Sequence, residues 1–319
     1  YEMSDTIPTV YQVLDGKAPA NTRAVRSQFA PATRVQYSGG GTTITQVLIT
    51  DVSRKPYQQY MYEEVLAPMG MTSSFYDQPV PAGKRAILAT GYKENGTEIK
   101  GKYHVYPEQA AAGLWTNPTD LAKYIIETQL SYQGKSSKVL SKETTIIRLK
   151  PLIDKEAGLG VFIMNKGGAT WFSHGGANEG FRCQYFGDLE NGNGVVVMVN
   201  SDNGAILNEI VNSVATVYGW RDFYNPVLKK LVTVDNAVLK TYTGKYEINP
   251  GFNLTVTLEG NQLKAGATNQ PTFDVYAEAE NMFFVKLFDA KIEFIKTGDK
   301  VDKLVLHQNG RQTTAKRTE

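Results

Sequence analysis

Apolar residues recur at helical spacing in the first third of the chain. In the stretch GTTITQVLITDVS at 41–53, four of them fall on one side of a helix: Ile44, Val47, Leu48 and Val52. The stretch KPYQQYMYEEVLAPMGM at 55–71 predicts a second helix. Pro56 lies near its first turn, where proline is tolerated, and Pro68 and Gly70 mark its end.

A third helix has the clearest start signal. The stretch at 116–130 offers Asn117 as N-cap, Pro118 at the first helical position and Asp120 in the first turn. The side chains that we expect on its buried face are Leu121, Tyr124, Ile125 and Thr128.

Strand patterns follow in the middle of the chain. Four short stretches are rich in β-branched and aromatic residues: 158–165, 170–176, 180–188 and 193–200. Between the last two, ENGNG at 190–194 is a strong hairpin signal. A helical pattern at 205–218 then ends at Gly219. Hairpins followed by a packed helix predict an antiparallel sheet covered by helices.

The pattern changes near 221–236, which we interpret as a connector, and we expect no helix beyond it. Apolar residues then alternate in short runs separated by turns: Leu254, Val256 and Leu258, Ile292 and Phe294, and Val301, Leu304 and Leu306. Such runs predict a small β-barrel or sandwich. We therefore expect an α+β fold with a helix-covered sheet domain at 1–222, a linker at 223–236 and a small β-barrel at 237–319.

Composition narrows the possible functions. The chain has 319 residues, 41% of them hydrophobic, which is enough for a real core. A net charge of +2 provides no basic field for nucleic acid, so no nucleic-acid partner is expected. The apolar run at 194–199 is far too short to span a bilayer. The single cysteine, Cys183, excludes an internal disulfide, and we interpret it as a packed strand residue.

Candidate chemistry is sparse. The three histidines, His104, His174 and His307, lack metal-ligand spacing, and we expect neither a metal nor a cofactor. Phosphate-binding, dinucleotide-binding and Gly-x-Ser-x-Gly motifs are absent from the sequence. Two features remain. One is Tyr37, which is followed by Ser38 and three glycines, and the other is the stretch SHGGANEGF at 173–181. Taken alone, Tyr37 is interpreted as a core aromatic and His174 as a packed or half-exposed strand histidine.

Taken together, several segments resemble a known family. The stretch at 31–76 is similar to the tyrosine-motif region of class C serine β-lactamases, penicillin-binding proteins, D-amino-acid peptidases and family VIII esterases, in which Pro-x-Thr precedes Tyr-Ser-Asn, two helices and Pro-Leu-Gly-Met. The stretch AAAGLWTNPTDLAKY at 110–124 resembles their Gly-Gly-Leu-x-Ser/Thr-x-x-Asp-Leu helix, and HGGANEGF at 174–181 their Lys-Thr-Gly or His-x-Gly strand. The resemblance covers 1–222, and the tail at 237–319 resembles the lipocalin-like β-domain often appended to these hydrolases.

The resemblance implies acyl transfer through a serine that lies in Ser-x-x-Lys. Tyr37 would exchange protons with this serine and with the leaving group, and His174 would occupy the position of the lysine in Lys-Thr-Gly. The backbone N–H of Ala177 would stabilise the oxyanion. The residues expected to contact a small-molecule or peptide substrate are Ser38, Gly39, Gly175, Gly176, Ala177 and Asn200.

Two departures from the family pattern affect the expected substrate. Gly39 replaces the asparagine of Tyr-Ser-Asn and removes a side-chain amide. An imidazole is mostly neutral at pH 7, so His174 attracts a substrate carboxylate less than a lysine does. Both changes favour an ester or peptide substrate over penicillins and cephalosporins. Asn200 matches a family asparagine after the last strand, although a turn residue is an equal interpretation.

The nucleophile is the largest departure. No serine in the sequence is followed three residues later by lysine, and only 36 residues precede Tyr37. In the family, Ser-x-x-Lys lies several tens of residues before the tyrosine. We therefore expect that the chain lacks the N-terminal part of the domain and forms no acyl-enzyme by itself.

Other interpretations stay open. The chain could be a non-catalytic remnant that binds a peptide or a cell-wall fragment, or the β-domain could dock a partner without any chemistry. Exposed core surface would call for a complementing N-terminal segment or for homo-oligomers. Relatives with this β-domain imply a periplasmic or secreted bacterial protein, and a solitary cysteine is compatible with that compartment.

Overall fold

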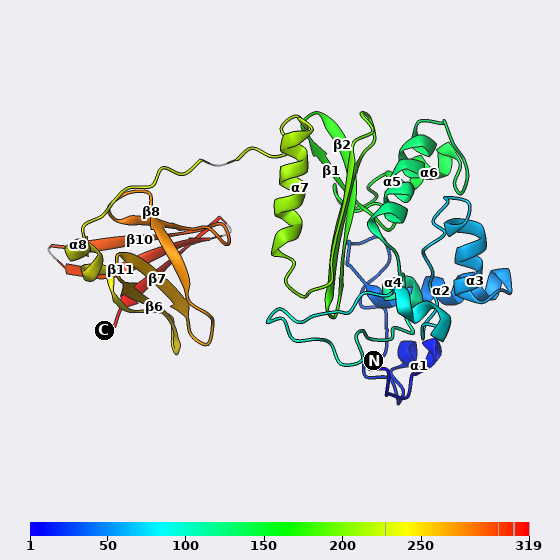
Figure 1. The fold of residues 1–319 in the computed structure, drawn as a ribbon, viewed down its shortest axis with the longest axis horizontal. Coiled ribbons are helices and arrows are strands. Elements are labelled where there is room, and N and C mark those ends of the chain that lie inside the picture. Colours follow the sequence, from blue (N-terminus) through cyan, green and yellow to red (C-terminus); the bar gives the residue numbers. More distant parts are fainter. Residues whose placement is uncertain (227, 299, 309, 319) are drawn as a thin grey trace. The chain divides into compact units, whose positions relative to one another are not determined.

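The computed structural model describes residues 1–226, 228–298, 300–308 and 310–318. The chain divides into two compact units, Tyr1–Asn225 and Pro226–Glu319. The first unit combines helices with an antiparallel sheet, and the second contains a closed barrel, so the fold is α+β as predicted (Figure 1).

The sheet of the first unit has the order β1-β2-β3-β4, and every neighbouring pair is antiparallel. The strands are β1 (Phe162–Lys166), β2 (Ala169–Asn178), β3 (Phe181–Asp188) and β4 (Gly194–Val199). These strands confirm the four predicted stretches, and the 190–194 turn joins β3 to β4.

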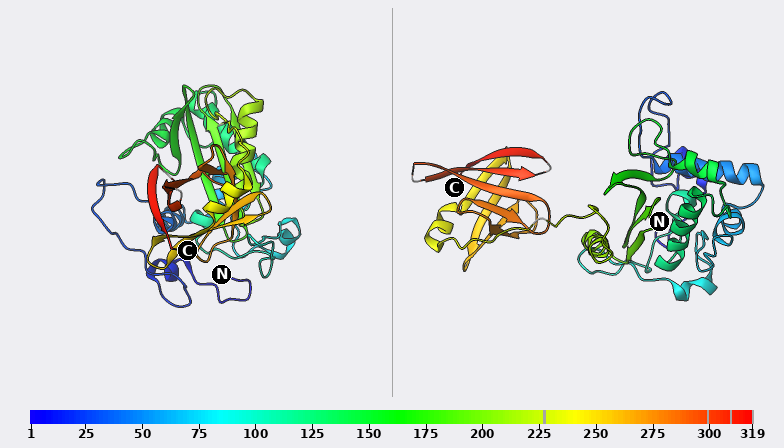
Figure 2. Two further views of the ribbon diagram at one scale, coloured as in Figure 1. Left: turned by 90° about the vertical axis from the view of Figure 1, so that its left-hand side faces the viewer. Right: turned by 90° about the horizontal axis from the view of Figure 1, so that it is seen from above.

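Helices cover both faces of this sheet (Figure 2). Helix α7 (Ala205–Val217) packs Leu207 and Val211 on one face beside Trp171. Helix α5 (Pro118–Tyr132) packs Ile125 against Phe172 on the other. The smaller helical elements are α1 (Val10–Asp15), α3 (Tyr57–Met61), a π-turn (Tyr62–Leu66), a 3-10 turn (Ala82–Ile87), α4 (Gln109–Ala112) and α6 (Lys142–Leu149).

The start of α5 confirms its sequence signal. The Asn117 side chain accepts a hydrogen bond from the Asp120 backbone N–H at 2.9 Å, and Pro118 occupies the first turn. The Asp120 carboxylate is buried and accepts bonds from the Ser74 hydroxyl at 2.9 Å and from Lys123 at 2.8 Å. These bonds tie the segment after the π-turn to α5.

Helix α2 (Gly39–Ser53) forms over the predicted residues, but its faces are reversed. An amphipathic helix in a globular protein normally buries its apolar face. In α2 the buried residues are Thr43 and Gln46. Ile44, Leu48 and Val52, which we call the α2 apolar stripe, are exposed by 50, 60 and 76%.

Polar contacts hold α2 in place. The Gln46 amide nitrogen donates to the Pro107 carbonyl at 3.1 Å and to the Gln109 side-chain oxygen at 3.2 Å. Its amide oxygen accepts from the Ala110 backbone N–H at 3.1 Å. The helix is therefore anchored on α4 through its polar side, and the apolar stripe faces away from that anchor.

The second unit is a closed antiparallel barrel with the order β10-β11-β12-β5-β6-β7-β8-β9. Its strands are β5 (Gly244–Asn249), β6 (Phe252–Glu259), β7 (Gln262–Ala267), β8 (Phe273–Ala277), β9 (Met282–Val285), β10 (Ala290–Thr297), β11 (Lys300–Gln308) and β12 (Arg311–Arg317). Side chains fill its interior, with Tyr242 stacked on Phe294 at 4.3 Å between ring centroids. The name lipocalin-like stays a prediction.

One expectation about this unit was wrong. Helix α8 (Asn236–Tyr242) forms where we expected no helix. The Asp235 side chain caps it by accepting from the Ala237 backbone N–H at 2.7 Å, and Leu239 and Tyr242 are buried in the barrel core. Tertiary burial thus supports a helix that is too short to show periodicity in the sequence.

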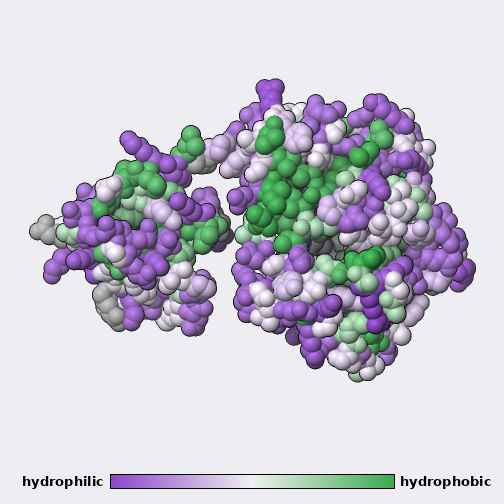
Figure 3. Space-filling view, viewed as in Figure 1, coloured by the Kyte–Doolittle hydropathy of each residue, from purple (hydrophilic) through white to green (hydrophobic). Residues whose placement is uncertain are grey.

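Among the residues described, no helix is long and apolar enough to cross a membrane. Apolar side chains nevertheless gather on part of the surface of the first unit, over α7 (Figure 3). Ile206, Ile210 and Val217 are the exposed apolar residues of that helix.

Candidate functional site

Tyr37 lies immediately before α2. The next residue, Ser38, is the N-cap of this helix, and its hydroxyl oxygen accepts from the Gly41 backbone N–H at 2.9 Å. A Cβ on Gly39 would meet nothing within 4 Å, so its glycine leaves open space beside the cap. The cap fixes the backbone next to Tyr37, while Tyr37 itself is 68% exposed.

His174 lies in β2, opposite Tyr185 of β3. Its Nδ1 is 2.5 Å from the Gly175 carbonyl oxygen. Because a carbonyl can only accept, this contact assigns the ring proton to Nδ1 and makes Nε2 of a neutral imidazole the acceptor.

The structure brings the two predicted catalytic rings together. The ring centroids of Tyr37 and His174 are 6.0 Å apart and tilted by 39°. A third ring, Phe162 of β1, lies 5.5 Å from His174 and is stacked on Tyr37 at 6.4 Å. Tyr37 and His174 are separated by 137 positions in sequence, so their approach is a property of the fold.

The backbone beside His174 is open on one edge. The register of β1 with β2 ends at the pair Phe162 and Ser173, so in the described part of the chain β1 does not continue alongside 174–178. On the other side, β2 remains paired with β3 through Asn178. Gly175, Gly176 and Ala177 are exposed there, and an open strand edge offers backbone N–H groups to a ligand.

Gly176 allows a close approach from the neighbouring strand. A Cβ at this position would lie 2.6 Å from the Cys183 sulfur. Any other residue would have to displace that thiol, which explains why glycine suits this position. Burial raises the pKa of the Cys183 thiol, which favours the neutral form at neutral pH.

The residue opposite His174, Tyr185, is buried and forms a phenol pair with the half-buried Tyr124. The Tyr185 and Tyr124 hydroxyls are 3.1 Å apart, and Arg148 also donates to Tyr124. Burial raises the pKa of Tyr185 well above its ordinary value. A neutral phenol therefore lies beside His174 on the neighbouring strand β3.

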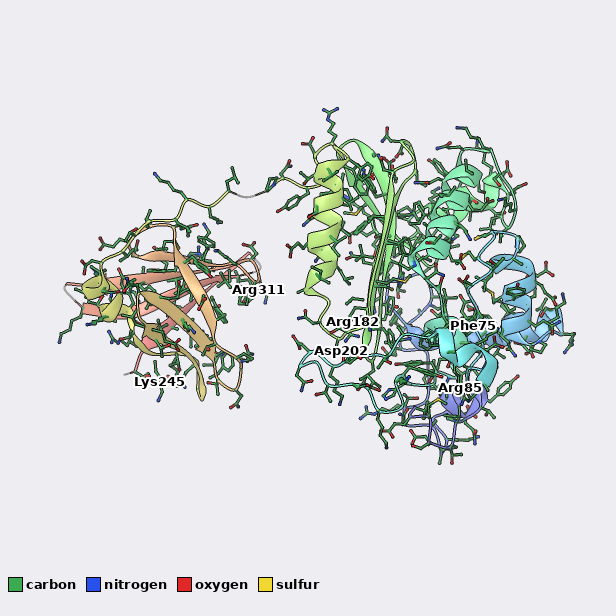
Figure 4. The ribbon with its side chains drawn as sticks, in the orientation of Figure 1. Phe75, Arg85, Arg182, Asp202, Lys245 and Arg311 are labelled. Carbon is green, nitrogen blue, oxygen red and sulfur yellow. The ribbon has the colours of Figure 1, made fainter. Side chains whose placement is uncertain are left out.

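An ion pair fixes the far end of β2 (Figure 4). Arg182 contacts Asp202 at 2.8 Å and donates to the Asn178 carbonyl. Asp202 also accepts from the Gly180 backbone N–H at 2.9 Å. These bonds hold the turn between β2 and β3 and thereby the stretch that contains the two glycines.

Asn200 does not lie on the strand that carries His174. It follows β4, and β3 separates β4 from β2 in the sheet order. Its side-chain amide donates to the Thr90 carbonyl at 2.8 Å. This contact favours the structural interpretation of Asn200, and its role in substrate binding remains a prediction.

Two neighbours of the site were missed from the sequence, namely Phe162 and the contact of Cys183 with Gly176. Phe162 had a usable signal, because Val161 and Ile163 on either side of it are apolar and successive residues of a strand face opposite ways. The contact of Cys183 depends on strand register, which no local pattern reveals.

Within the described ranges, no group of three or more His, Cys, Asp or Glu side chains could hold a metal ion. The expectation that the site works without metal or cofactor remains a prediction.

Comparisons with known proteins agree with this fold. The family model described as Beta-lactamase matches residues 7–211, and the chain therefore belongs to the Beta-lactamase family. A second model, described as a domain of unknown function (DUF3471), matches residues 228–317. A human protein named Putative beta-lactamase-like 1 is 27% identical over 162 residues, which are 50% of this chain and 30% of that protein. The chain thus spans less than a third of this relative.

Two solved structures resemble nearly the whole chain. The octameric penicillin-binding protein homologue from Pyrococcus abyssi is 20% identical, with a TM-score of 0.58, and the match covers 98% of this chain and 72% of that one. The crystal structure of SurE is 19% identical, with a TM-score of 0.54, and the match covers 98% and 75%. At this identity the likeness establishes the fold alone.

Proposed function

We propose that this chain forms the tyrosine and histidine side of a serine hydrolase that acts on an ester, amide or peptide, and that the nucleophile lies in polypeptide outside these 319 residues. The observation that carries the proposal is the approach of Tyr37 and His174, 6.0 Å between ring centroids, beside the open edge of β2. Membership of the Beta-lactamase family supports the reaction class.

Each group has a definite task in this proposal. The serine oxygen attacks the substrate carbonyl carbon, and its proton reaches the leaving group through the Tyr37 hydroxyl. The phenol oxygen takes the serine proton as it gives its own to the leaving group, and the carbonyl–heteroatom bond breaks. The developing oxyanion accepts from backbone N–H groups, with Ala177 as one donor. Water then attacks the acyl-serine, and Tyr37 takes and returns a proton in the same way. His174 presents Nε2 as an acceptor for a substrate N–H or O–H.

The α2 apolar stripe supports a nucleophile from another segment. A helix that exposes Ile44, Leu48 and Val52 while burying Thr43 and Gln46 has the pattern expected for one side of an interface. Tyr37 directly precedes this helix, so a segment packed on the stripe would also lie beside the phenol. No serine of the 319 residues has a lysine three positions later.

A second candidate function is non-catalytic binding of a peptide or cell-wall fragment at the same edge of β2. The lack of Ser-x-x-Lys in the sequence favours it. The exposed glycines and the open strand edge would bind an extended ligand equally well without chemistry.

We also propose two broader properties. The octameric Pyrococcus homologue motivates a test for homo-oligomers by light scattering. Export to the periplasm or the medium, which the single cysteine permits, is tested by fractionation of the source cells.

Labelling with a fluorophosphonate tests the hydrolase proposal. We expect the protein isolated from its source to be labelled on a serine outside residues 1–319, and Tyr37→Phe to slow labelling by about 100-fold or more. Tyr218→Phe is the matched control, because Tyr218 is similarly exposed at 74% and lies at the end of α7. Fast labelling of Tyr37→Phe would remove the phenol from the mechanism, and no labelling at all would favour the binding function.

A further inference from the structure

Phe162 is an exposed aromatic residue that the proposed mechanism does not use. It opens β1, and its neighbours Val161 and Ile163 are buried to 3 and 4% exposure, whereas Phe162 is 41% exposed. Exposing a phenyl ring forgoes the stabilisation of burying its apolar surface. Packing in the core of the sheet therefore does not explain why an aromatic residue stands at position 162.

The surroundings of the ring are specific. Phe162 is nearly parallel to Tyr37, with an interplanar angle of 16° and a centroid distance of 6.4 Å. It is tilted by 30° to His174 at 5.5 Å. Phe162 thus completes a set of three mutually close rings, which we call the ring cluster: Tyr37, Phe162 and His174.

The ring cluster is located where a substrate must lie if the proposed function is correct. Its members come from the residue before the N-cap of α2, from the start of β1 and from the middle of β2. Phe162 pairs with Ser173, the residue just before the open edge of β2, so a group bound at that edge meets this ring beside it.

We propose that Phe162 is a specificity-determining residue that selects substrates with a neutral aromatic group next to the reacting carbonyl. The inference rests on the proposed function and specifies its substrate class. Aromatic rings prefer offset-stacked or edge-to-face partners, and two phenyl-type rings at this spacing offer both. None of the three side chains carries a fixed positive charge as a lysine or arginine would, so the cluster offers an anionic group little attraction.

Ligand binding to the 319-residue chain tests this proposal without any need for the serine. Saturation-transfer NMR would compare three probes: benzyl acetate, which is neutral and aromatic, butyl acetate, which is neutral and aliphatic, and phenylacetate, which is an aromatic anion. We expect benzyl acetate to bind most tightly. Phe162→Ala should weaken its binding by about 5- to 10-fold, in keeping with the loss of one aromatic contact.

Two further variants make the result specific. Phe162→Leu keeps an apolar side chain but removes the ring, so it should lose most of the preference for benzyl over butyl acetate. Phe288→Ala is the matched control, because Phe288 in the barrel unit has nearly the same exposure, 40%, and also lies against an aromatic ring, that of Phe273 at 5.1 Å. It should leave all three affinities unchanged.

Equal effects of Phe162→Ala and Phe288→Ala would overturn the proposal. So would phenylacetate binding as tightly as benzyl acetate, or the absence of benzyl acetate binding to the wild-type chain. These outcomes are separate from those of fluorophosphonate labelling. A protein that does not label but shows the Phe162-dependent preference retains the specificity site without the hydrolase chemistry.

Discussion

The barrel unit and helix α2 place their apolar side chains in opposite ways. In the barrel, alternate residues of the strands point inward, and Leu254, Ile292 and Phe294 are all at most 3% exposed. In α2, the residues with the same apolar character, Ile44, Leu48 and Val52, point outward. In both segments the spacing of the apolar residues fits the secondary structure, alternating in the strands and helical in α2. The difference is that the described part of the chain provides a packing partner for the apolar side of the strands but not for the apolar side of α2.

This comparison explains what holds each part together. The barrel closes on itself, so every described strand has two neighbours and one common core. Helix α2 relies on the hydrogen bonds of Gln46 to the segment around α4. Substitutions should therefore be costly at buried apolar positions in the barrel and at buried polar positions in α2.

The largest effect is expected for Phe294→Ala. Phe294 is 1% exposed and contacts the rings of Tyr242, Tyr246 and Phe283. Its truncation should lower the free energy of unfolding of the barrel by about 3–5 kcal/mol. Far-UV circular dichroism in urea would show the earlier transition.

Tryptophan fluorescence provides the internal control for Phe294→Ala. The three tryptophans, Trp115, Trp171 and Trp220, all lie in the first unit, so their transition should not move. Leu287→Ala should leave both transitions in place, because Leu287 is exposed. A similar loss for Leu287→Ala would contradict the filled-core account of the barrel.

Gln46→Ala should have the next largest effect. Removing the amide leaves the Pro107 carbonyl, the Ala110 N–H and the Gln109 side chain without this partner, and we expect a loss of about 1–3 kcal/mol. Urea unfolding followed by tryptophan fluorescence measures it. Thr45→Ala, on the exposed side of α2, is the control and should change stability by less than about 0.5 kcal/mol. Equal stability of the two variants would break the polar-anchor explanation.

Acid should weaken the first unit through Asp120. Burial raises the pKa of this carboxyl, but the bonds from Lys123, Ser74 and the Ser73 backbone N–H outweigh burial and hold the pKa below its ordinary value. A lowered folded pKa stabilises the protein above the unfolded value of about 3.9, and this contribution is lost as pH falls through the folded pKa.

Unfolding by urea at pH 7 and at pH 3, followed by tryptophan fluorescence, measures this dependence. Asp120→Asn should be less stable than the wild type at pH 7 by about 1–3 kcal/mol and should lose less on acidification. An unchanged pH dependence in the variant would show that other carboxyl groups carry it.

The smallest effect on the isolated chain is expected for Leu48→Ser. Leu48 is already 60% exposed, so its free energy of unfolding should change by less than about 0.5 kcal/mol. The same substitution should reduce fluorophosphonate labelling of the protein isolated from its source, because the proposed nucleophile segment packs there. Normal labelling would show that the α2 apolar stripe is not part of that interface.

The sequence predicted the regular elements with strong local signals. The four strands of the sheet, the Asn117 cap and helix α2 follow from alternation, capping residues and periodicity, and the structure confirms them. The barrel follows from short alternating runs. Helix α8 was missed because seven residues are too few to establish a helical period, and its stability comes from Leu239 and Tyr242 in the core.

The site was predictable only in part. Tyr37 and His174 could be chosen because of the family resemblance, whereas their distance is set by the fold. The reversed faces of α2 could not be predicted, since periodicity gives which residues share a face but not which face is buried. The exposure of Phe162 had a local signal, but its contact with Tyr37 is set by the fold.

Photo-crosslinking from position 48 tests the central claim most directly. Leu48 would be replaced by p-benzoylphenylalanine in the protein expressed in its source, and the crosslinked peptide would be identified by mass spectrometry. We predict a crosslink to a peptide outside residues 1–319 that contains a serine followed three residues later by lysine, the same peptide that fluorophosphonate labels. A crosslink confined to residues 1–319, within one chain or between copies, would contradict the account.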